Sequence, residues 1–73
     1  MGRYANEARY HEEQIRYYHS TAGKNGYKQA VYHWDKLHTL RFSADRSRSG
    51  KADVVVISEI IKSLSEIMAE IKG

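Results

Sequence analysis

The feature that most constrains this chain is an aliphatic stripe in its last third. Apolar residues recur there at spacings of three and four, which places them on one face of a helix: Ile57, Ile60, Ile61, Leu64, Ile67, Met68 and Ile71. The pattern predicts a helix over about 54–72. The β-branched run from Val54 to Ile57 leaves a short strand as an alternative there. Either way, this much aliphatic surface has to be covered by other parts of the chain or by a partner.

The chain has 73 residues, which is enough for one domain and a small core. It contains no cysteine, so disulfides and thiolate zinc sites are excluded. The lack of cysteine is also compatible with a reducing compartment, and we expect a cytoplasmic protein. No apolar run approaches the roughly 18 residues that a membrane span needs. We therefore expect stability to come from helix packing, oligomerisation or docking onto another protein.

Two further helices are predicted in the first two thirds of the chain. The first, over about 4–22, carries a weak stripe: Tyr4, Ala8, His11, Ile15, Tyr18 and Ala22. The second covers about 27–45, with one face predicted to pack on the first helix: Tyr27, Ala30, Val31, Trp34, Leu37, His38 and Arg41. The short connection Gly-Lys-Asn-Gly over 23–26 makes the two helices antiparallel. Trp34 is the predicted centre of their contact because it brings the largest apolar area.

The segment 43–51 is predicted to be a mobile, basic linker. It alternates arginine with serine, ends in a glycine and a lysine, and has no aliphatic side chain larger than alanine. The fold expected for residues 1–73 is therefore a single all-α domain. An αα-hairpin and a C-terminal amphipathic helix close a three-helix bundle. The stripe covers both d-type and e-type positions, which is wider than a two-stranded coiled coil needs, and we expect part of it to form a homodimer in addition to the bundle.

Tyrosines are the most unusual component of the chain, with six of them against a single phenylalanine. Tyrosine is enriched at protein interfaces, since it offers a large area and keeps a polar tip. One interpretation is a partner-binding surface: Arg9, Tyr10, Arg16, Tyr17 and Tyr32. The other interpretation is that a hairpin poor in aliphatics uses tyrosine as half-buried filler.

The charge of the chain is uneven, and the middle is basic. A string of cations suggests an alternative role in nucleic-acid binding: Lys36, Arg41, Arg46, Arg48 and Lys51. Tyrosines and Trp34 would supply stacking surfaces for bases. The net charge of +3 is modest, however, and aspartates interrupt the string. A solvated segment that only keeps the protein in solution explains the same residues.

The four histidines do not follow the spacing of a helical zinc site, because no two are four residues apart. A metal site across the hairpin, with His19 facing His33 near Asp35, is a minor alternative. We expect instead that histidines line a helix–helix contact, and we expect no metal and no cofactor. No nucleophile and base are brought together by a local motif, and so small a chain can hardly enclose a substrate. The sequence therefore favours a protein that is not an enzyme.

Residues 26–37 resemble the second helix of a tetratricopeptide repeat. That family places an aromatic residue after the turn, a small residue three positions later and a second aromatic four beyond it. Tyr27, Ala30 and Trp34 match these positions. The resemblance implies a protein-binding helical hairpin. The preceding helix departs from the family, because Tyr17 and Tyr18 stand where a small residue is expected, and one copy of such a repeat is not stable alone.

These observations favour one function over the others. The leading hypothesis is a non-catalytic helical interaction module that regulates or inhibits a larger protein, of the kind found among bacterial and phage accessory proteins. The alternative is a nucleic-acid-binding protein that uses residues 36–51. A third hypothesis is an assembly factor whose only role lies in the C-terminal helix.

Overall fold

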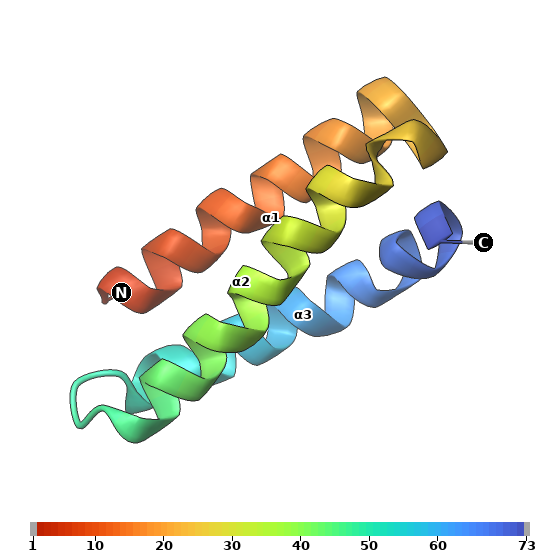
Figure 1. Ribbon diagram of the computed structural model, residues 1–73. Coiled ribbons are helices and arrows are strands. Elements are labelled where there is room, and N and C mark those ends of the chain that lie inside the picture. Colours follow the sequence, from red (N-terminus) through yellow and green to blue (C-terminus); the bar gives the residue numbers. More distant parts are fainter. Residues whose placement is uncertain (1, 73) are drawn as a thin grey trace.

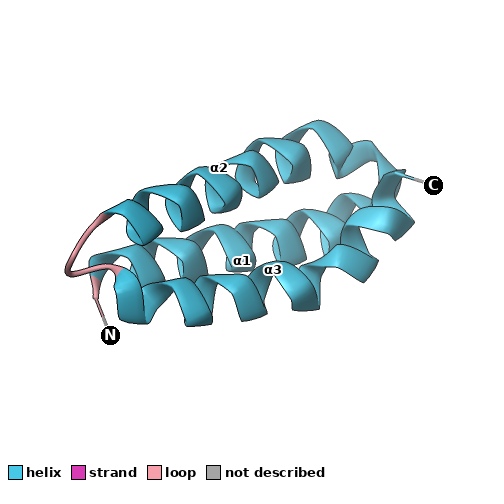
Figure 2. Ribbon diagram, turned by 90° about the horizontal axis from the view of Figure 1, so that it is seen from below, coloured by secondary structure: helices cyan, strands magenta, loops and turns pink. Residues whose placement is uncertain are grey.

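Three helices account for nearly all of the residues that the computed structural model describes, which are 2–72. They are α1 (Arg3–Ala22), α2 (Tyr27–Arg46) and α3 (Lys51–Lys72), with a short 3-10 helix η1 (Gly23–Gly26) between the first two. No strand occurs in that range. Each helix runs antiparallel to the one before it, so α1 and α3 are parallel (Figures 1 and 2). The fold is all-α, with an αα-hairpin and a third helix that closes a three-helix bundle, as the sequence predicts.

The core is built mainly by the aliphatic stripe of α3. Most of that stripe is buried between α1 and α2: Ile57, Ile60, Leu64, Met68 and Ile71. Ile61 and Ile67 are half-buried. They are six positions apart, which places them about 120° apart around the helix, on opposite edges of the buried face. The stripe is therefore largely used within one chain, and the homodimer stays a prediction.

The run from Val54 to Ile57 is helical, and the strand alternative does not occur. Helix α3 begins at Lys51, where the amides of Asp53 and Val54 donate to the carbonyl of Gly50 at 3.0 and 3.2 Å. Valine is tolerated here because its helix propensity is only slightly below average and Ile57 becomes fully buried.

The predicted mobile linker over 43–51 is wrong in extent. Helix α2 continues to Arg46, Lys51 already belongs to α3, and only residues 47–50 form a turn. Ala44 is fully buried, which anchors the last turn of α2 in the core. Gly50 fits against it closely: a Cβ at Gly50 would lie 2.7 Å from the carbonyl oxygen of Ala44. Hydrogen bonds from the amides of Ser47 and Gly50 tie the turn.

The α1–α2 connection follows the sequence prediction. Gly23 ends α1 with a positive φ of 55°, which glycine adopts without a steric penalty, and its amide donates to the carbonyl of His19. Gly26 is buried, and a Cβ there would lie 3.0 Å from the carbonyl oxygen of Tyr18. The glycines therefore permit the reversal that sets α1 against α2. The tetratricopeptide resemblance remains a prediction.

The centre of the α1–α2 contact differs from the one predicted. Trp34 is only half-buried, whereas Ala30, His33 and Leu37 are buried. At the middle of α2, the residue that is buried is therefore His33 and not its neighbour Trp34, which the sequence predicts to be buried. The reason is size: Ala8 and Ala30 are fully buried, and such small side chains allow a close approach that an indole would prevent.

Candidate functional site

A pair of histidines lies at the middle of the contact between α1 and α2. His11 and His33 are 7% and 8% exposed. Their Nδ1 atoms are 2.8 Å apart, which is hydrogen-bond distance. The sequence prediction that histidines line a helix–helix contact is confirmed for these two, but the pairing of His19 with His33 is wrong.

Burial lowers the pKa of both histidines. For His11 the loss of solvation is the main cause, and the nearby His33 and Lys36 lower the pKa further, whereas Glu7 raises it. For His33 burial is the cause. Both rings therefore resist protonation more than a histidine in water does. The pair favours the uncharged state at neutral pH.

Tyrosine rings surround His33 on both helices. The Tyr32 ring lies edge-on at 5.1 Å between centroids, the Tyr10 ring at 6.0 Å, and the Tyr18 ring stacks at 6.2 Å. Tyr18 in turn contacts Tyr17 at 5.3 Å. These aromatic contacts join side chains of α1 and α2 into one cluster whose centre is a buried histidine.

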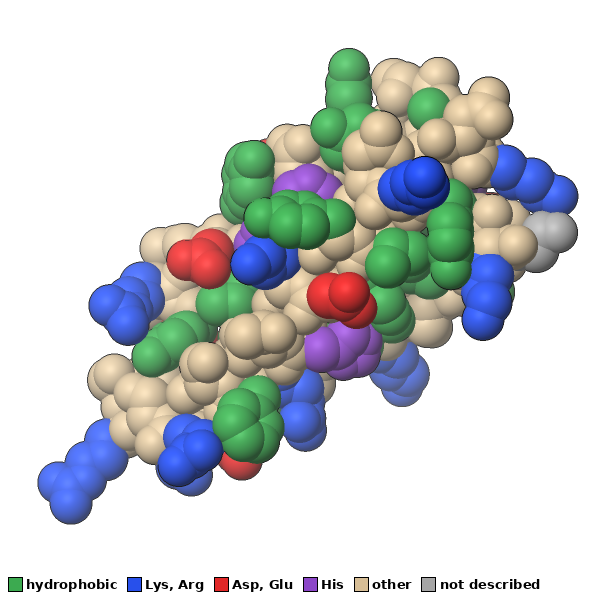
Figure 3. Space-filling view, viewed as in Figure 1, with side chains coloured by type: hydrophobic (Ala, Val, Ile, Leu, Met, Phe, Trp, Pro, Cys, Tyr) green, Lys and Arg blue, Asp and Glu red, His purple; other side chains and the backbone are tan. Residues whose placement is uncertain are grey.

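Three of these tyrosines point largely into solvent. Tyr10 is 52% exposed, and Tyr17 and Tyr32 are each 57% exposed. We call these three residues the tyrosine surface. Figure 3 shows hydrophobic side chains beside histidine side chains along the face that α1 and α2 share. Exposed aromatic rings on a rigid pair of helices form a surface able to bury a large area at low entropic cost.

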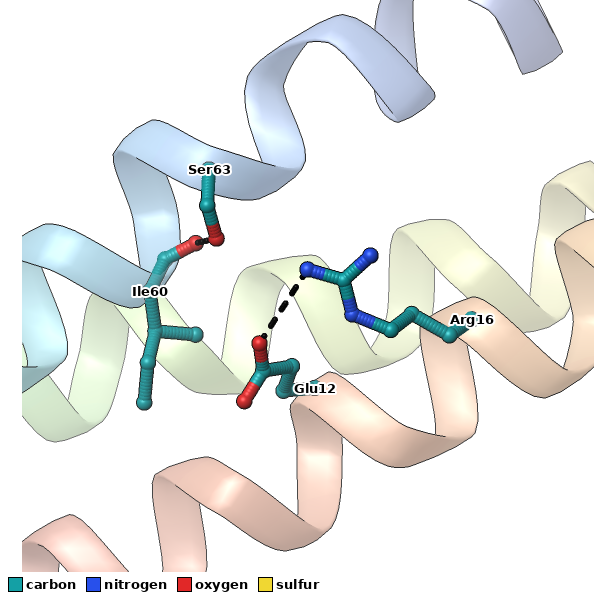
Figure 4. Close-up of polar contacts among 4 residues, drawn as sticks. All are labelled: Glu12, Arg16, Ile60 and Ser63. Atoms are coloured by element: carbon teal, nitrogen blue, oxygen red, sulfur yellow. Dashed lines mark hydrogen bonds and ion pairs between the residues drawn. The ribbon is translucent and has the colours of Figure 1, made fainter.

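The predicted partner-binding set is only partly brought together. Arg9 precedes Tyr10 and Arg16 precedes Tyr17, so each arginine points about 100° away from the tyrosine next to it. Arg16 donates to Glu12 Oε2 at 3.3 Å, and both side chains lie on the side of α1 that faces α3 (Figure 4). Lys36 is a cation beside the tyrosine surface, and its Nζ lies 5.3 Å from the centre of the Tyr32 ring.

Two contacts between α1 and α3 were missed by the sequence analysis. The carboxylate of Asp53 accepts hydrogen bonds from the amides of Gly2 and Ala5, each at 3.2 Å. Asp53 therefore caps α1, although it lies in the first turn of α3. At the opposite end, His19 Nε2 lies 3.2 Å from Glu70 Oε2. Both contacts join residues about fifty positions apart, which local patterns do not reveal.

The basic residues of the nucleic-acid alternative do not form one line. Lys36 and Arg41 are five residues apart, as are Arg41 and Arg46, so Arg41 points about 140° away from each of the other two around α2. Arg41 Nε donates to Ser58 Oγ of α3 at 2.9 Å. Arg46 lies over the Phe42 ring at 5.5 Å, and Phe42 is 61% exposed. Arg48 is exposed in the turn, and Lys51 is exposed at the start of α3.

A groove of about 290 Å³ lies between the start of α2 and the end of α3. The residues that line the groove are mostly apolar: Tyr27, Val31, Trp34, Met68, Ala69 and Lys72. Of the residues that the structure describes, no carboxylate or histidine lines this groove. Its polar side chains are Tyr27 and Lys72.

Within residues 2–72, no three histidine or carboxylate side chains gather closely enough to hold a metal ion. His33 pairs with His11, and His19 pairs with Glu70. The hypothetical site from His19, His33 and Asp35 is thus not assembled. No helix within the described range has the length and apolar character needed to cross a membrane.

Comparison with known proteins adds no assignment. No protein-family model, curated protein sequence or solved structure matches this chain. The functional argument therefore rests on the tyrosine surface and the histidine pair beneath it.

Proposed function

We propose that this protein is a non-catalytic interaction module that binds a larger protein through the tyrosine surface and regulates or inhibits it. An accessory role in a bacterium or phage, in the cytoplasm, belongs to the same proposal. The observation that carries it is that Tyr10, Tyr17 and Tyr32 are each more than half exposed while their rings join one cluster around His33.

The rigidity of the support favours binding over simple filling of a gap. A side chain that binds a partner gains most when its position is fixed before the partner arrives. Tyr10 and Tyr32 are held by edge-on contacts with His33, and Tyr17 by an edge-on contact with Tyr18. Their outer faces stay open to solvent. Aromatic anchors of this kind supply most of the binding energy in many interfaces.

The test is capture of partners from a bacterial lysate by the immobilised protein, its Tyr10→Ala/Tyr17→Ala variant and a Phe42→Ala control. Phe42 is as exposed as these tyrosines, but it lies near the C-terminal end of α2, whereas Tyr32 lies near the start of that helix. We expect the tyrosine variant to lose affinity by more than about 30-fold, as for an interface hot spot. The Phe42→Ala control should bind as the unaltered protein does.

Two outcomes would count against the proposal. One is that all three proteins capture the same partners equally well. The other is that Phe42→Ala loses the partner while the tyrosine variant keeps it. Helical circular dichroism of each variant shows that the bundle is intact before the capture is interpreted.

Nucleic-acid binding remains the second candidate, and one observation favours it. The exposed Phe42 ring with the Arg46 guanidinium over it is a surface on which a base can stack. The spread of Lys36, Arg41 and Arg46 around α2 disfavours a continuous phosphate track. A gel shift with single-stranded oligonucleotides that weakens with salt and with Phe42→Ala would support this candidate over the first.

A further inference from the structure

The histidine pair allows only certain numbers of protons. A hydrogen bond between the Nδ1 atoms of His11 and His33, at 2.8 Å, needs one N–H donor and one free lone pair. When both rings are neutral, one carries its proton on Nδ1 and the other on Nε2. When one ring is an imidazolium, it donates to the neutral one. When both are imidazolium ions, two N–H groups face each other and the bond is impossible.

The surroundings do not relieve that conflict. The charged groups that act on His11 are Glu7 of α1 and His33 and Lys36 of α2, and Lys36 opposes a further positive charge. On α3 the buried ionisable group is Asp53. Its carboxylate is bonded to Gly2 and Ala5, and Ala5 precedes His11 by six residues, or about 9 Å along α1. Two adjacent imidazolium ions would therefore repel each other in a buried site with no carboxylate bonded to them.

Separation of the two rings would also disturb the tyrosine surface. The Tyr10 ring contacts both histidines, with centroids 5.3 Å from His11 and 6.0 Å from His33. The position of the Tyr32 ring is fixed by its contact with the His33 ring, with 5.1 Å between the two centroids. Since His11 lies on α1 and His33 on α2, moving these rings apart moves Tyr10 away from Tyr32.

We propose that the His11–His33 pair makes the tyrosine surface acid-sensitive: the surface is assembled while the pair holds at most one extra proton, and it comes apart when the pair takes a second. The module would then hold its partner at neutral pH and release it in mild acid. The release of a partner rests on the proposed function. The response of the histidines and tyrosines belongs to the free protein and is testable without any partner.

The direction of the pH effect follows from the folded-state pKa values, which lie below the usual 6.5 for both histidines. The unfolded chain therefore binds more protons than the folded one. The pair's contribution to stability is complete above about pH 6.5 and is lost as the pH falls below that value. One proton excluded from the folded state lowers the folding equilibrium constant by up to about tenfold per pH unit.

The experiment compares urea unfolding at about pH 7.5 and about pH 5 for three proteins. They are the unaltered chain, the His11→Leu/His33→Leu variant, and a His19→Gln/His38→Gln control that removes the other two histidines. We expect the unaltered chain and the control to lose about 10- to 30-fold in the folding constant. The leucine variant should change by less than about threefold, because two apolar groups can replace a buried hydrogen-bonded pair without an unmet partner.

A second measurement keeps the proposal testable if the leucine variant does not fold. In the unaltered protein, the ring protons of His11 and His33 are followed by NMR as the pH is lowered. We expect the pKa of each of these two histidines to lie below the usual 6.5, and we expect the two rings to affect each other's titration. We also expect contacts from the Tyr10 and Tyr32 rings to His33 to disappear in the same pH range.

The proposal is overturned if His11 and His33 titrate at or above the usual pKa of 6.5, if the leucine variant loses stability as steeply as the unaltered chain, or if the tyrosine–histidine contacts survive at about pH 5. Failure of the proposed function looks different. In that case the acid response of the free protein is present, but no captured partner depends on Tyr10 and Tyr17.

Discussion

The capping of α1 by Asp53 yields the most direct quantitative prediction. Its carboxylate accepts from the amide of Gly2, which is partly buried, and from the amide of Ala5, which is buried. The bond from the Gly2 amide is a helix cap and contributes about 1 kcal/mol. The bond from the Ala5 amide contributes about 2 kcal/mol, because its acceptor is charged and its loss leaves a buried donor without a partner. We therefore expect Asp53→Ala to lower the free energy of unfolding by about 3 kcal/mol.

That loss is large for so small a protein. A chain of 73 residues has a total stability on the order of 4–11 kcal/mol. Urea unfolding followed by circular dichroism should show a midpoint lower by about 2 M or more, with an unchanged slope. Asp53→Asn should cost about half as much, since one side-chain oxygen remains to accept. Asp45→Ala, at an exposed site near the end of α2, should change stability by less than about 0.5 kcal/mol.

Local amide exchange sharpens the same prediction. Loss of the cap should speed exchange at the Ala5 amide more than at the amides of Leu64 and its neighbours in the core of α3. The capping argument is refuted if Asp53→Ala costs less than about 0.5 kcal/mol, or if Asp45→Ala costs as much. In either case the two bonds to α1 would not contribute measurably to stability.

Three further predictions use the same urea titration. Leu64→Ala should lower the free energy of unfolding by about 2–5 kcal/mol, because Leu64 is fully buried, whereas Ile61→Ala at the half-buried edge should cost less. Gly50→Ala should cost about 1–3 kcal/mol, because the added methyl group must push against the backbone of Ala44, and no effect would contradict the close packing of that turn. Tyr17→Ser should leave stability within about 0.5 kcal/mol, and a larger loss would favour a structural role over partner binding.

The helices were predictable because their periodicity is carried by side chains that become buried. In α3 every third or fourth residue from Ile57 is an aliphatic, and the core follows that pattern. On α2 the same periodicity holds, but the sequence analysis assigned it to a different set of residues from the one that is buried. The buried set Ala30, His33, Leu37, Leu40 and Ala44 also keeps spacings of three and four, but Trp34 drew the prediction to a neighbouring face. The prediction gave the large aromatic Trp34 more weight than the regular spacing that runs from Ala30 through His33 to Leu37.

Other features depend on residues far apart in sequence, so the local pattern could not reveal them. The composition of segment 43–51 predicts a linker, yet Ala44 is buried because Gly50 lets the two backbones approach. For the histidine pair, the sequence spacing indicates that both residues face the core, but it does not reveal the hydrogen bond between them. His11 falls on the predicted stripe of the first helix, and His33 continues the spacing of Ala30 and Leu37. The bond between them depends on the helix register, which the sequence does not state.

The attachment of α1 explains why its surface is suited to regulation. Apart from alanines, Ile15 is the one aliphatic side chain that the described part of α1 buries in the core. The helix is also held by polar contacts along its length, to Asp53 near its start, to His33 at its middle and to Glu70 near its end. Apolar packing of α2 on α3 does not change with protonation, whereas the contact with His33 does. The tyrosine surface spans α1 and α2, so it lies across the one seam of the bundle whose centre is a titratable hydrogen bond.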